Sequence, residues 1–247
     1  MAAVGRIIRD AAPTFITLQE VTPRIQALLR SCNWWRDYVA SDPPETGQPY
    51  YTLMLAHKAQ VPGVTPRSFR RQAFGNSVMG RCLLTVMTSV GGAPLAVATS
   101  HLESPCPPQG MFVAERGHQL REVMRVLEAA PAGNVLFAGD LNWVDARDGA
   151  PPLAGGWCDA WLAARPGDPG FTYDTRSNKM LVGNWPGNRL DRVLARLRDM
   201  RISSMRLVGQ DAIPGVTYVK EFRNGGSKRL PVLPSDHYGL LLELDIT

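Results

Sequence analysis

The chain has 247 residues, of which 45% are apolar and 20% are charged, and its net charge at neutral pH is +5. This length and composition support one sizeable hydrophobic core, so we expect a single domain spanning residues 1–247. No apolar run approaches 18 residues, and Arg6, Arg9 and Asp10 interrupt the segment that a signal peptide would need to be apolar. We therefore expect a soluble protein without membrane association, and the positive charge favours an anionic partner.

The four cysteines are expected to be free thiols. They are Cys32, Cys82, Cys106 and Cys158, they show no CxxC spacing, and they lie mostly inside periodic segments. Such usage is typical of a reducing compartment and argues against disulfides or a zinc site.

The first half of the chain alternates helical and strand patterns. Val4, Ile7 and Ile8 share one face of a helix that Pro13 ends, and Thr22 can cap a helix beginning at Pro23. Strands are expected over 15–18, 51–55, 82–90 and 95–99, with a loop over 43–49 and a loop or hairpin carrying Arg67, Arg70 and Arg71.

The second half continues this alternation. We expect a helix over about 114–129, a short helix over 157–162, a polar turn over 171–175, strands over 190–195, 201–207 and 239–244, and a mobile basic loop over 218–229 that includes Arg223. There are no repeats and no low-complexity linker. The pattern indicates one unit of the α/β class with many antiparallel hairpins.

The stretch from Asn134 to Asn142, NVLFAGDLN, is the centre of the predicted site. Its apolar residues are typical of a buried strand, and Gly139 would let the backbone turn at the strand end. Asp140 and Asn142 follow at the carboxyl end, where open α/β sheets usually place their sites. Taken alone, the two residues are equally compatible with an ordinary turn.

Polar side chains stand at five predicted strand ends. They are Glu20, His101, the pair Asp140 and Asn142, Asp191, and the pair Asp236 and His237. Each alone has an ordinary explanation, such as a helix cap, a core histidine or a turn, but five coincidences are improbable. Carboxylates and an amide suit a hard cation such as Mg²⁺, and histidine beside carboxylate suits charge stabilisation or proton transfer at phosphorus.

These residues lie in motifs that resemble a known family. The motifs are LQEVT (18–22), SHLES (100–104), GDLNW (139–143), RLDRVL (189–194) and SDHYGLL (235–241), and they resemble the endonuclease/exonuclease/phosphatase superfamily in its usual order. SHLES, FTYDT and LPVLPSDH are similar to the type 2, 5′-specific tyrosyl-DNA phosphodiesterases, most of all the plant and algal branch. The resemblance implies a DNase I-like, four-layer α/β/β/α sandwich of two mixed sheets.

The resemblance also implies a role for each site residue. Glu20 would bind Mg²⁺, for which Mn²⁺ could substitute, and Asp236 would serve the metal through its surrounding shell. Asp140 would deprotonate the attacking water, Asn142 would hold that water or a phosphate oxygen, and His237 would stabilise phosphoryl charge while Asp191 orients it. His101 and Ser104 would contact the phosphate. Weaker candidates for a DNA groove are Tyr50, Tyr51, Tyr173 and Arg116.

Three functions are compatible with the sequence. The first, implied by the resemblance, is repair of DNA 5′ ends by hydrolysis of the phosphotyrosyl bond to a trapped topoisomerase-type protein, by a monomer in the nucleus. A second is another phosphoesterase of the superfamily, such as an abasic-site nuclease or an inositol or lipid phosphatase. The third is a catalytically silent binding module, because the family begins with an asparagine-bearing strand that nothing here matches. We expect these residues to be an incomplete domain of low stability that lacks this first strand.

Overall fold

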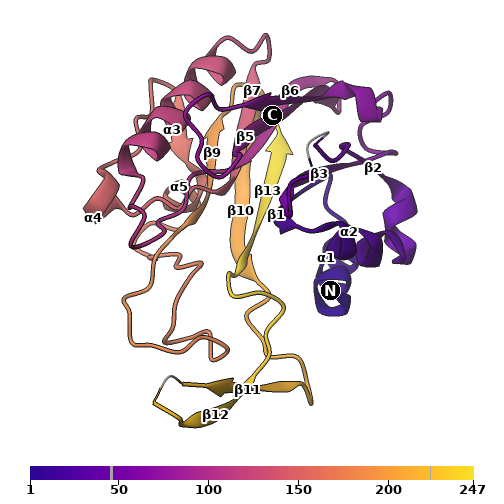
Figure 1. Ribbon diagram of the computed structural model, residues 1–247. Helices are drawn as coiled ribbons and strands as arrows, with labels where there is room; N and C mark the ends of the chain where they lie inside the picture. Colours follow the sequence, from indigo (N-terminus) through magenta and orange to yellow (C-terminus); the bar gives the residue numbers. More distant parts are fainter. Residues whose placement is uncertain (45–46, 223) are drawn as a thin grey trace.

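A computed structural model describes residues 1–44, 47–222 and 224–247. Part of the predicted loop 43–49 and Arg223 of the predicted basic loop lie outside the described residues. Two layers of strands pack face to face, with helices on the outside (Figure 1). This arrangement confirms the predicted α/β sandwich. None of the helices in the described ranges is long and apolar enough to span a membrane.

One layer is a continuous mixed sheet of six strands. In spatial order these are β4 (Phe69–Ala73), β5 (Cys82–Val90), β6 (Ala93–His101), β7 (Asn134–Asp140), β9 (Asp191–Arg196) and β8 (Trp157–Asp159). Strands β6 and β7 pair in parallel, and all the other pairs are antiparallel. Helix α3 (Val113–Glu128) covers the outer face, because Leu120, Val123 and Leu127 lie on one side of it and pack against Val135 and Phe137.

The opposite layer consists of two separate pieces. Strands β1 (Phe15–Val21), β3 (Tyr51–His57) and β2 (Tyr38–Ala40) form one piece, and β10 (Met200–Val208) and β13 (Gly239–Ile246) form the other. In the described ranges, β1 and β13 each have a strand partner on one side only. The predicted two-sheet architecture is therefore present, with its second sheet interrupted.

Helices cover the outer face of the first piece. They are α1 (Ala2–Ala11) and α2 (Pro23–Arg30), followed by the 3₁₀ helix η1 (Asn33–Asp37). The predicted cap is confirmed, since the Thr22 hydroxyl accepts a hydrogen bond from the Ile25 amide at 3.1 Å. Ile8 and Leu29 pack against Leu53 of β3. The layer order is thus helix, sheet, sheet, helix, with Met54, Leu84 and Val97 in the apolar core between the sheets.

The remaining elements are short, and two of them correct the sequence analysis. They are η2 (Pro66–Ser68), α4 (Asp145–Asp148), α5 (Ala160–Ala164), β11 (Thr217–Glu221) and β12 (Ser227–Pro231). The helix predicted over 157–162 begins as strand β8, because Trp157–Asp159 pairs with β9 before α5 starts. The mobile loop predicted over 218–229 is wrong. Most of this segment forms the β11–β12 hairpin.

The prediction of free cysteines is confirmed, because Cys32, Cys82, Cys106 and Cys158 form no disulfide.

Candidate active site

Strand register brings three of the predicted site residues into one row. His101, the last residue of β6, pairs with Asp140, the last residue of β7, and Asp140 pairs with Asp191, the first residue of β9. Neighbouring strands lie about 5 Å apart, so the three side chains share one end of the sheet. The predicted clustering of polar strand ends is confirmed for these three residues.

Gly139 makes this row possible for a reason that the sequence analysis missed. It lies inside β7, opposite Ser100, and does not form a turn after the strand. A Cβ atom at this position would lie 2.0 Å from the backbone oxygen of Ser100. The glycine is therefore required for the close approach of β6 and β7, and this approach sets the spacing between His101 and Asp140.

His237 enters the site from the segment before β13 and pairs with Asp191. Its Nδ1 lies 2.8 Å from Asp191 Oδ2. Burial disfavours the imidazolium, but the hydrogen bond and charge of Asp191, with the charges of Asp140 and Asp236, raise the pKa of His237 to about 9. At neutral pH the site therefore holds a histidinium cation whose ring orientation is fixed by Asp191.

Asp140 is the most deeply buried carboxylate of the row. Burial and the charge of Asp191 raise its pKa to about 7, against the opposing effects of His237, the Asn142 amide and Arg81. The Asn142 amide donates to Asp140 Oδ1 at 2.8 Å, and Asp140 Oδ2 lies 3.3 Å from His101 Nε2. A carboxylate whose pKa lies near neutrality is suited to accept a proton in a reaction at neutral pH.

Arg81 is a site residue that the sequence analysis missed. Its guanidinium lies 2.7 Å from His101 Nδ1 and donates to Ser104 Oγ at 2.9 Å, with only 6% of the residue exposed. Because a guanidinium only donates, His101 Nδ1 accepts and its proton sits on Nε2, facing Asp140. Burial and the charges of Arg81 and His237 lower the pKa of His101 well below its usual value, so this histidine is neutral. No motif marks Arg81 in the sequence.

Asn142 and Ser104, which the sequence analysis assigned to water and phosphate contacts, are hydrogen-bonded to each other. The Asn142 side chain donates from Nδ2 to the Leu102 carbonyl at 3.1 Å and to Ser104 Oγ at 3.0 Å. Asn142 has a φ of 49°, a left-handed conformation that asparagine tolerates better than most residues. These bonds fix the amide beside Asp140.

The loop 171–190 supplies Tyr173 and two positioning residues that the sequence analysis did not identify. The Tyr173 ring centre lies 5.1 Å from that of His237. The buried Thr172 hydroxyl accepts from the amide of Asp191, and its carbonyl accepts from the amide of Tyr238, next to His237. Asn178 Nδ2 donates to the carbonyl of Asp236 at 3.1 Å. This loop therefore sets the relative positions of Asp191 and His237.

Glu20 and Asp236 are exposed and do not join this cluster. Glu20 lies in β1 at a register shift with a φ of 57°, and Asp236 Oδ1 accepts from Ser235 Oγ at 3.2 Å. In the described part of the chain, the group able to hold a metal is Asp140, Asp191 and His237, whose ligand atoms lie within 4.8 Å of one another. Metal binding by Glu20 and Asp236 stays a prediction.

The donor chemistry of the cluster fits a hard cation. Two carboxylates face each other, and their mutual repulsion contributes to the raised pKa of Asp140. A divalent cation between the carboxylates would offset this repulsion, and carboxylate oxygens are the ligands that Mg²⁺ and similar ions prefer. His237 remains paired with Asp191 and supplies positive charge of its own.

The prediction that Arg116 contacts the substrate is wrong. Its guanidinium is fully buried, pairs with Asp148 at 2.5 Å, and donates to the carbonyl of Glu103 at 2.7 Å. The sequence could not reveal this role because the partner lies 32 residues away. Arg116 instead braces the segment that follows β7, since Asp148 also accepts from the amide of Val144.

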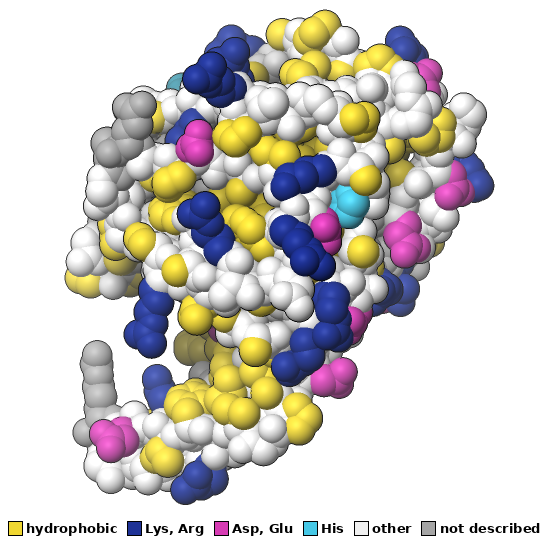
Figure 2. Space-filling view, turned by 90° about the vertical axis from the view of Figure 1, so that its right-hand side faces the viewer, with side chains coloured by type: hydrophobic (Ala, Val, Ile, Leu, Met, Phe, Trp, Pro, Cys, Tyr) yellow, Lys and Arg dark blue, Asp and Glu magenta, His cyan; other side chains and the backbone are white. Residues whose placement is uncertain are grey.

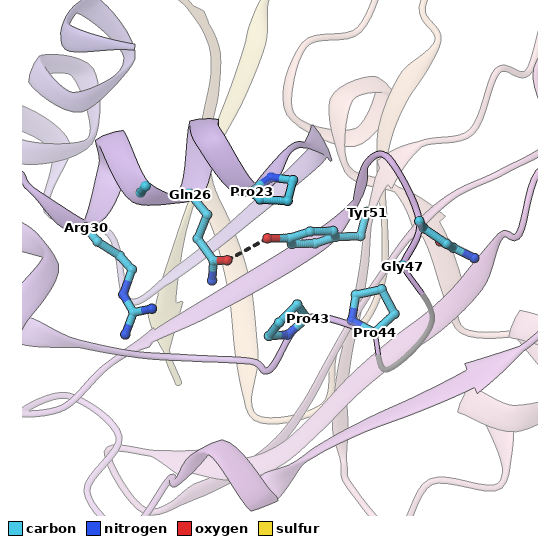
Figure 3. Close-up of a pocket in the computed structure, with 9 residues that line it drawn as sticks. Pro23, Gln26, Arg30, Pro43, Pro44, Gly47 and Tyr51 are labelled. Atoms are coloured by element: carbon cyan, nitrogen blue, oxygen red, sulfur yellow. Dashed lines mark hydrogen bonds between the residues drawn. The ribbon is translucent and has the colours of Figure 1, made fainter.

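The two tyrosines proposed for a DNA groove have different environments. Tyr51 is 7% exposed, and its hydroxyl donates to Gln26 Oε1 at 2.5 Å on the wall of a cavity of about 250 Å³ between α2 and a segment that contributes Pro43, Pro44, Gly47 and Gln48 (Figure 3). Tyr50 lies beside the site, with its ring centre 5.6 Å from the Arg81 guanidinium. Tyr50 is therefore better placed than Tyr51 to meet a ligand.

Comparison with known proteins agrees with this geometry. The model of the Endonuclease/Exonuclease/phosphatase family matches residues 1–237. Tyrosyl-DNA phosphodiesterase 2 of Rattus norvegicus is 32% identical over 95% of this chain, and that of Homo sapiens is 31% identical over 95%. This chain spans 59% and 60% of the length of these two relatives.

A solved structure gives the same fold with a bound nucleic acid. The structure of D. rerio TDP2 complexed with single strand DNA product has a TM-score of 0.76 and 25% identity, covering 99% of this chain and 93% of that chain. The site geometry and the family match lead to the same assignment. The geometry consists of the row of His101, Asp140 and Asp191 and the pair of His237 with Asp191, and the match covers residues 1–237. The chain belongs to the endonuclease/exonuclease/phosphatase family.

Proposed function

We propose that this chain is a divalent-metal-dependent hydrolase that cleaves the 5′-phosphotyrosyl bond between DNA and a trapped topoisomerase-type protein. The observation that carries the proposal is the pairing of a cationic His237 with Asp191 beside a buried carboxylate, Asp140, at one sheet end. The relatives at about 30% identity bear the name of this activity. A monomer acting in DNA repair in the nucleus is part of the same proposal.

Asp140 is proposed to take a proton from the attacking water. Its pKa of about 7 lets it be ionised in a large fraction of molecules at neutral pH while remaining a useful base. The neutral His101 lies with Nε2 beside one carboxylate oxygen, and the backbone amide of Asn142 donates to the other. Water bound between Asp140 and the Asn142 side chain would be oriented toward phosphorus.

The positive groups are proposed to stabilise the charge that develops on the phosphoryl oxygens. His237 and Arg81 approach the row from opposite sides, through Asp191 and His101 respectively. Ser104 bridges Arg81 and Asn142 and can donate or accept at a phosphate oxygen. Preorganised charges of this kind typically contribute a few kcal/mol each to transition-state stabilisation.

The leaving group places little demand on the enzyme. A tyrosine phenolate has a pKa near 10, far below that of an alkoxide, so a strong general acid is not required. Tyr173 packs against His237 and is proposed to contact the aromatic ring or the adjoining sugar. The phenolate leaving group and the proposed contact with Tyr173 together favour hydrolysis of an aryl phosphodiester over an alkyl one.

A metal ion would complete the site. Asp191 presents a fitting oxygen beside the base Asp140, and Glu20 and Asp236 are proposed as further ligands, Asp236 through water. A bound Mg²⁺, or Mn²⁺ in its place, supplies Lewis-acid stabilisation of a phosphoryl oxygen.

The direct test is hydrolysis of an oligonucleotide that carries a 5′-phosphotyrosyl group. We expect turnover that EDTA abolishes and Mg²⁺ restores, with 5′ tyrosyl ends preferred over 3′ ends. Abasic DNA, inositol phosphates and a 3′-phosphotyrosyl oligonucleotide serve as competing substrates. A clear preference for any of these would replace the proposal with another phosphoesterase activity, and no turnover of any would favour the silent binding module.

A further inference from the structure

The hairpin of β11 and β12 projects away from the sandwich. Figure 1 shows it at the bottom of the molecule, with the loop 171–190 descending beside it. A two-stranded hairpin is marginally stable alone, so its attachment matters. Tyr218 provides that attachment, because its hydroxyl donates to the Met180 carbonyl of the loop at 2.7 Å. We call the loop 171–190 and the described residues of the hairpin, 217–222 and 224–231, together the arm.

The arm is fixed to the catalytic residues at its base. Asn178 in the loop donates to the carbonyls of Ser235 and Asp236, one and two residues before His237. Met180, which holds Tyr218, lies two residues beyond Asn178 in the chain. A short run of hydrogen bonds therefore connects the projecting hairpin to the site.

Two lysines on the arm face each other without acidic partners. Strand pairing sets Tyr218 opposite Leu230 and Lys220 opposite Lys228, so alternation along the strands puts all four on one face. Tyr218 and Leu230 turn this face toward the loop, since Tyr218 bonds to Met180 and Leu230 is 4% exposed. Like charges directly opposite destabilise a hairpin. Among the described residues neither lysine forms an ion pair, so the pair is suited to an anion from outside the chain.

Trp185 gives the arm an exposed aromatic surface. It is 68% exposed, which is unusual for a side chain of this size. Its backbone is nevertheless held, because its amide donates to Thr175 Oγ1 at 3.0 Å and that hydroxyl donates back to its carbonyl at 3.3 Å. Thr175 lies two residues after Tyr173, which packs on His237. The indole is thus presented from a braced segment next to the site.

Basic side chains extend over much of this molecule. In Figure 2 they lie across the visible face from the top down to the projecting hairpin at the bottom. Basic side chains combined with an exposed aromatic suit a single-stranded nucleic acid, because every unpaired base offers a face for stacking. A duplex offers phosphates but no free base faces along its length, and a poly-glutamate peptide offers charges but no rings.

We propose that the arm holds the unpaired nucleic-acid strand that continues from the scissile phosphate. Trp185 stacks on a base, and Lys220 and Lys228 contact backbone phosphates further along the strand. The arm thereby selects substrates with several unpaired nucleotides over short or fully paired ones. This inference rests on the proposed function, and it adds a strand-binding site outside the catalytic cluster.

Charge reversal with a matched control tests the lysines. Lys220→Glu with Lys228→Glu is compared with Arg121→Glu with Arg125→Glu, two exposed residues of α3 that form no ion pair in the described ranges. Both double variants change the net charge by the same amount. Binding of a 20-nucleotide single strand is measured by fluorescence anisotropy at several salt concentrations. The arm variant should bind at least about tenfold more weakly, and its salt slope should fall by about 1.4, the value for two phosphate contacts on a single strand.

The cleavage assay compares a 20-nucleotide and a two-nucleotide substrate, each with a 5′-phosphotyrosyl group. The arm variant should lose at least about tenfold in the ratio of kcat/KM for the long substrate to that for the short one, and the α3 variant should keep the ratio. If both variants lose affinity equally, the lysines act only through net charge and the proposal is wrong. Failure of the unmodified chain to cleave either substrate would overturn the proposed function, whereas the anisotropy result still decides the arm.

Substitutions of Trp185 test whether its indole stacks on a base. Trp185→Ala should weaken single-strand binding by about tenfold, and Trp185→Phe should restore part of it, because loss of a base–aromatic stack has effects of this order. Neither change should alter binding of a blunt duplex. Equal losses on single strand and duplex, or tighter binding of a poly-glutamate peptide than of the oligonucleotide, would contradict a strand-binding arm.

Discussion

The two strand layers differ in how firmly they position side chains. In the six-stranded sheet, β7 is paired on both sides, and His101, Asp140 and Asp191 stand in one row across three strands. In the opposite layer, β1 and β13 are each paired on one side within the described ranges. Continuous pairing fixes a catalytic row, and the interrupted layer leaves its own candidate, Glu20, exposed at a register shift.

The two layers also differ in how deeply their apolar side chains are buried. Val135 and Phe137 in β7 are fully buried, whereas Leu240, Leu241 and Leu242 in β13 remain partly exposed although they form an apolar run. The backbone of Glu20 adopts a left-handed conformation that is uncommon for residues other than glycine, asparagine and aspartate. The row of His101, Asp140 and Asp191 therefore lies on the continuously paired layer, and the proposed metal ligand Glu20 lies on the interrupted one.

The largest effect is expected where α3 covers the continuous sheet. Arg116→Met should lower the free energy of unfolding by about 3 kcal/mol, because the fully buried Asp148 then keeps only the partly exposed Arg147 as a guanidinium partner. Arg121→Met, on the exposed face of the same helix, should change it by less than about 0.5 kcal/mol. Urea denaturation measures both. Similar small changes in the two variants would show that the buried pair does not support the sheet.

The next effect concerns the catalytic row. Asp140→Asn should keep the fold and lower kcat on a 5′-phosphotyrosyl oligonucleotide by about 10²–10³-fold, because the amide cannot accept the proton of water. His237→Ala should have a loss of similar size through the missing cation. Asp245→Asn, at an exposed ion pair of β13, serves as the control. Activity of either site variant within a few fold of the unmodified chain would refute the assigned roles.

How far the sequence predicted this site depends on the kind of signal. His101, Asp140, Asp191 and His237 were predicted together because each follows or begins an apolar strand within a recognisable motif. Arg81 and Thr172 were missed because each acts through partners distant in sequence, and no local pattern marks such contacts. Fold and strand ends follow from periodicity, whereas single long-range contacts require the tertiary structure.

The hairpin shows a second limit of sequence reasoning. Lys220, Lys228 and Arg229 suggest a mobile basic loop. The Asn224-Gly225 pair, in contrast, favours a tight turn between two strands. The structure forms five cross-strand pairs there, from Thr217↔Pro231 to Glu221↔Ser227. The high content of basic residues led to a loop prediction, although the segment forms two paired strands.

Hydrogen exchange should show the difference between the two layers directly. Backbone amides of β1 and β13, each paired on one side only in the described ranges, should exchange faster than those of β6 and β7, which are paired on both sides. Equal exchange rates in these two pairs of strands would show that the interruption does not weaken the second layer.

The last effect is a pH dependence of stability that originates in His237 and Asp140. The pKa of His237 is raised to about 9 from its ordinary value of 6.5, so between these pH values the folded chain binds more protons than the unfolded chain. Unfolding then releases protons, and stability falls as the pH rises through this range. Asp140, with its pKa raised to about 7 from 3.8, contributes a fall of the same sign between pH 4 and 7.

These two contributions can be separated by measuring Tm from pH 4 to 10 in the presence of EDTA, which keeps metal from shifting either group. His237→Gln should flatten the curve mainly above about pH 6.5, and Asp140→Asn mainly below about pH 7, with a smaller change elsewhere because each charge also shifts the pKa of the other group. Because Asp140 and Asp191 repel each other, Asp140→Asn should also raise the absolute Tm at pH 8. A variant that instead lowers Tm there would mean that the carboxylate is already compensated, and the case for a cation between Asp140 and Asp191 would fail with it.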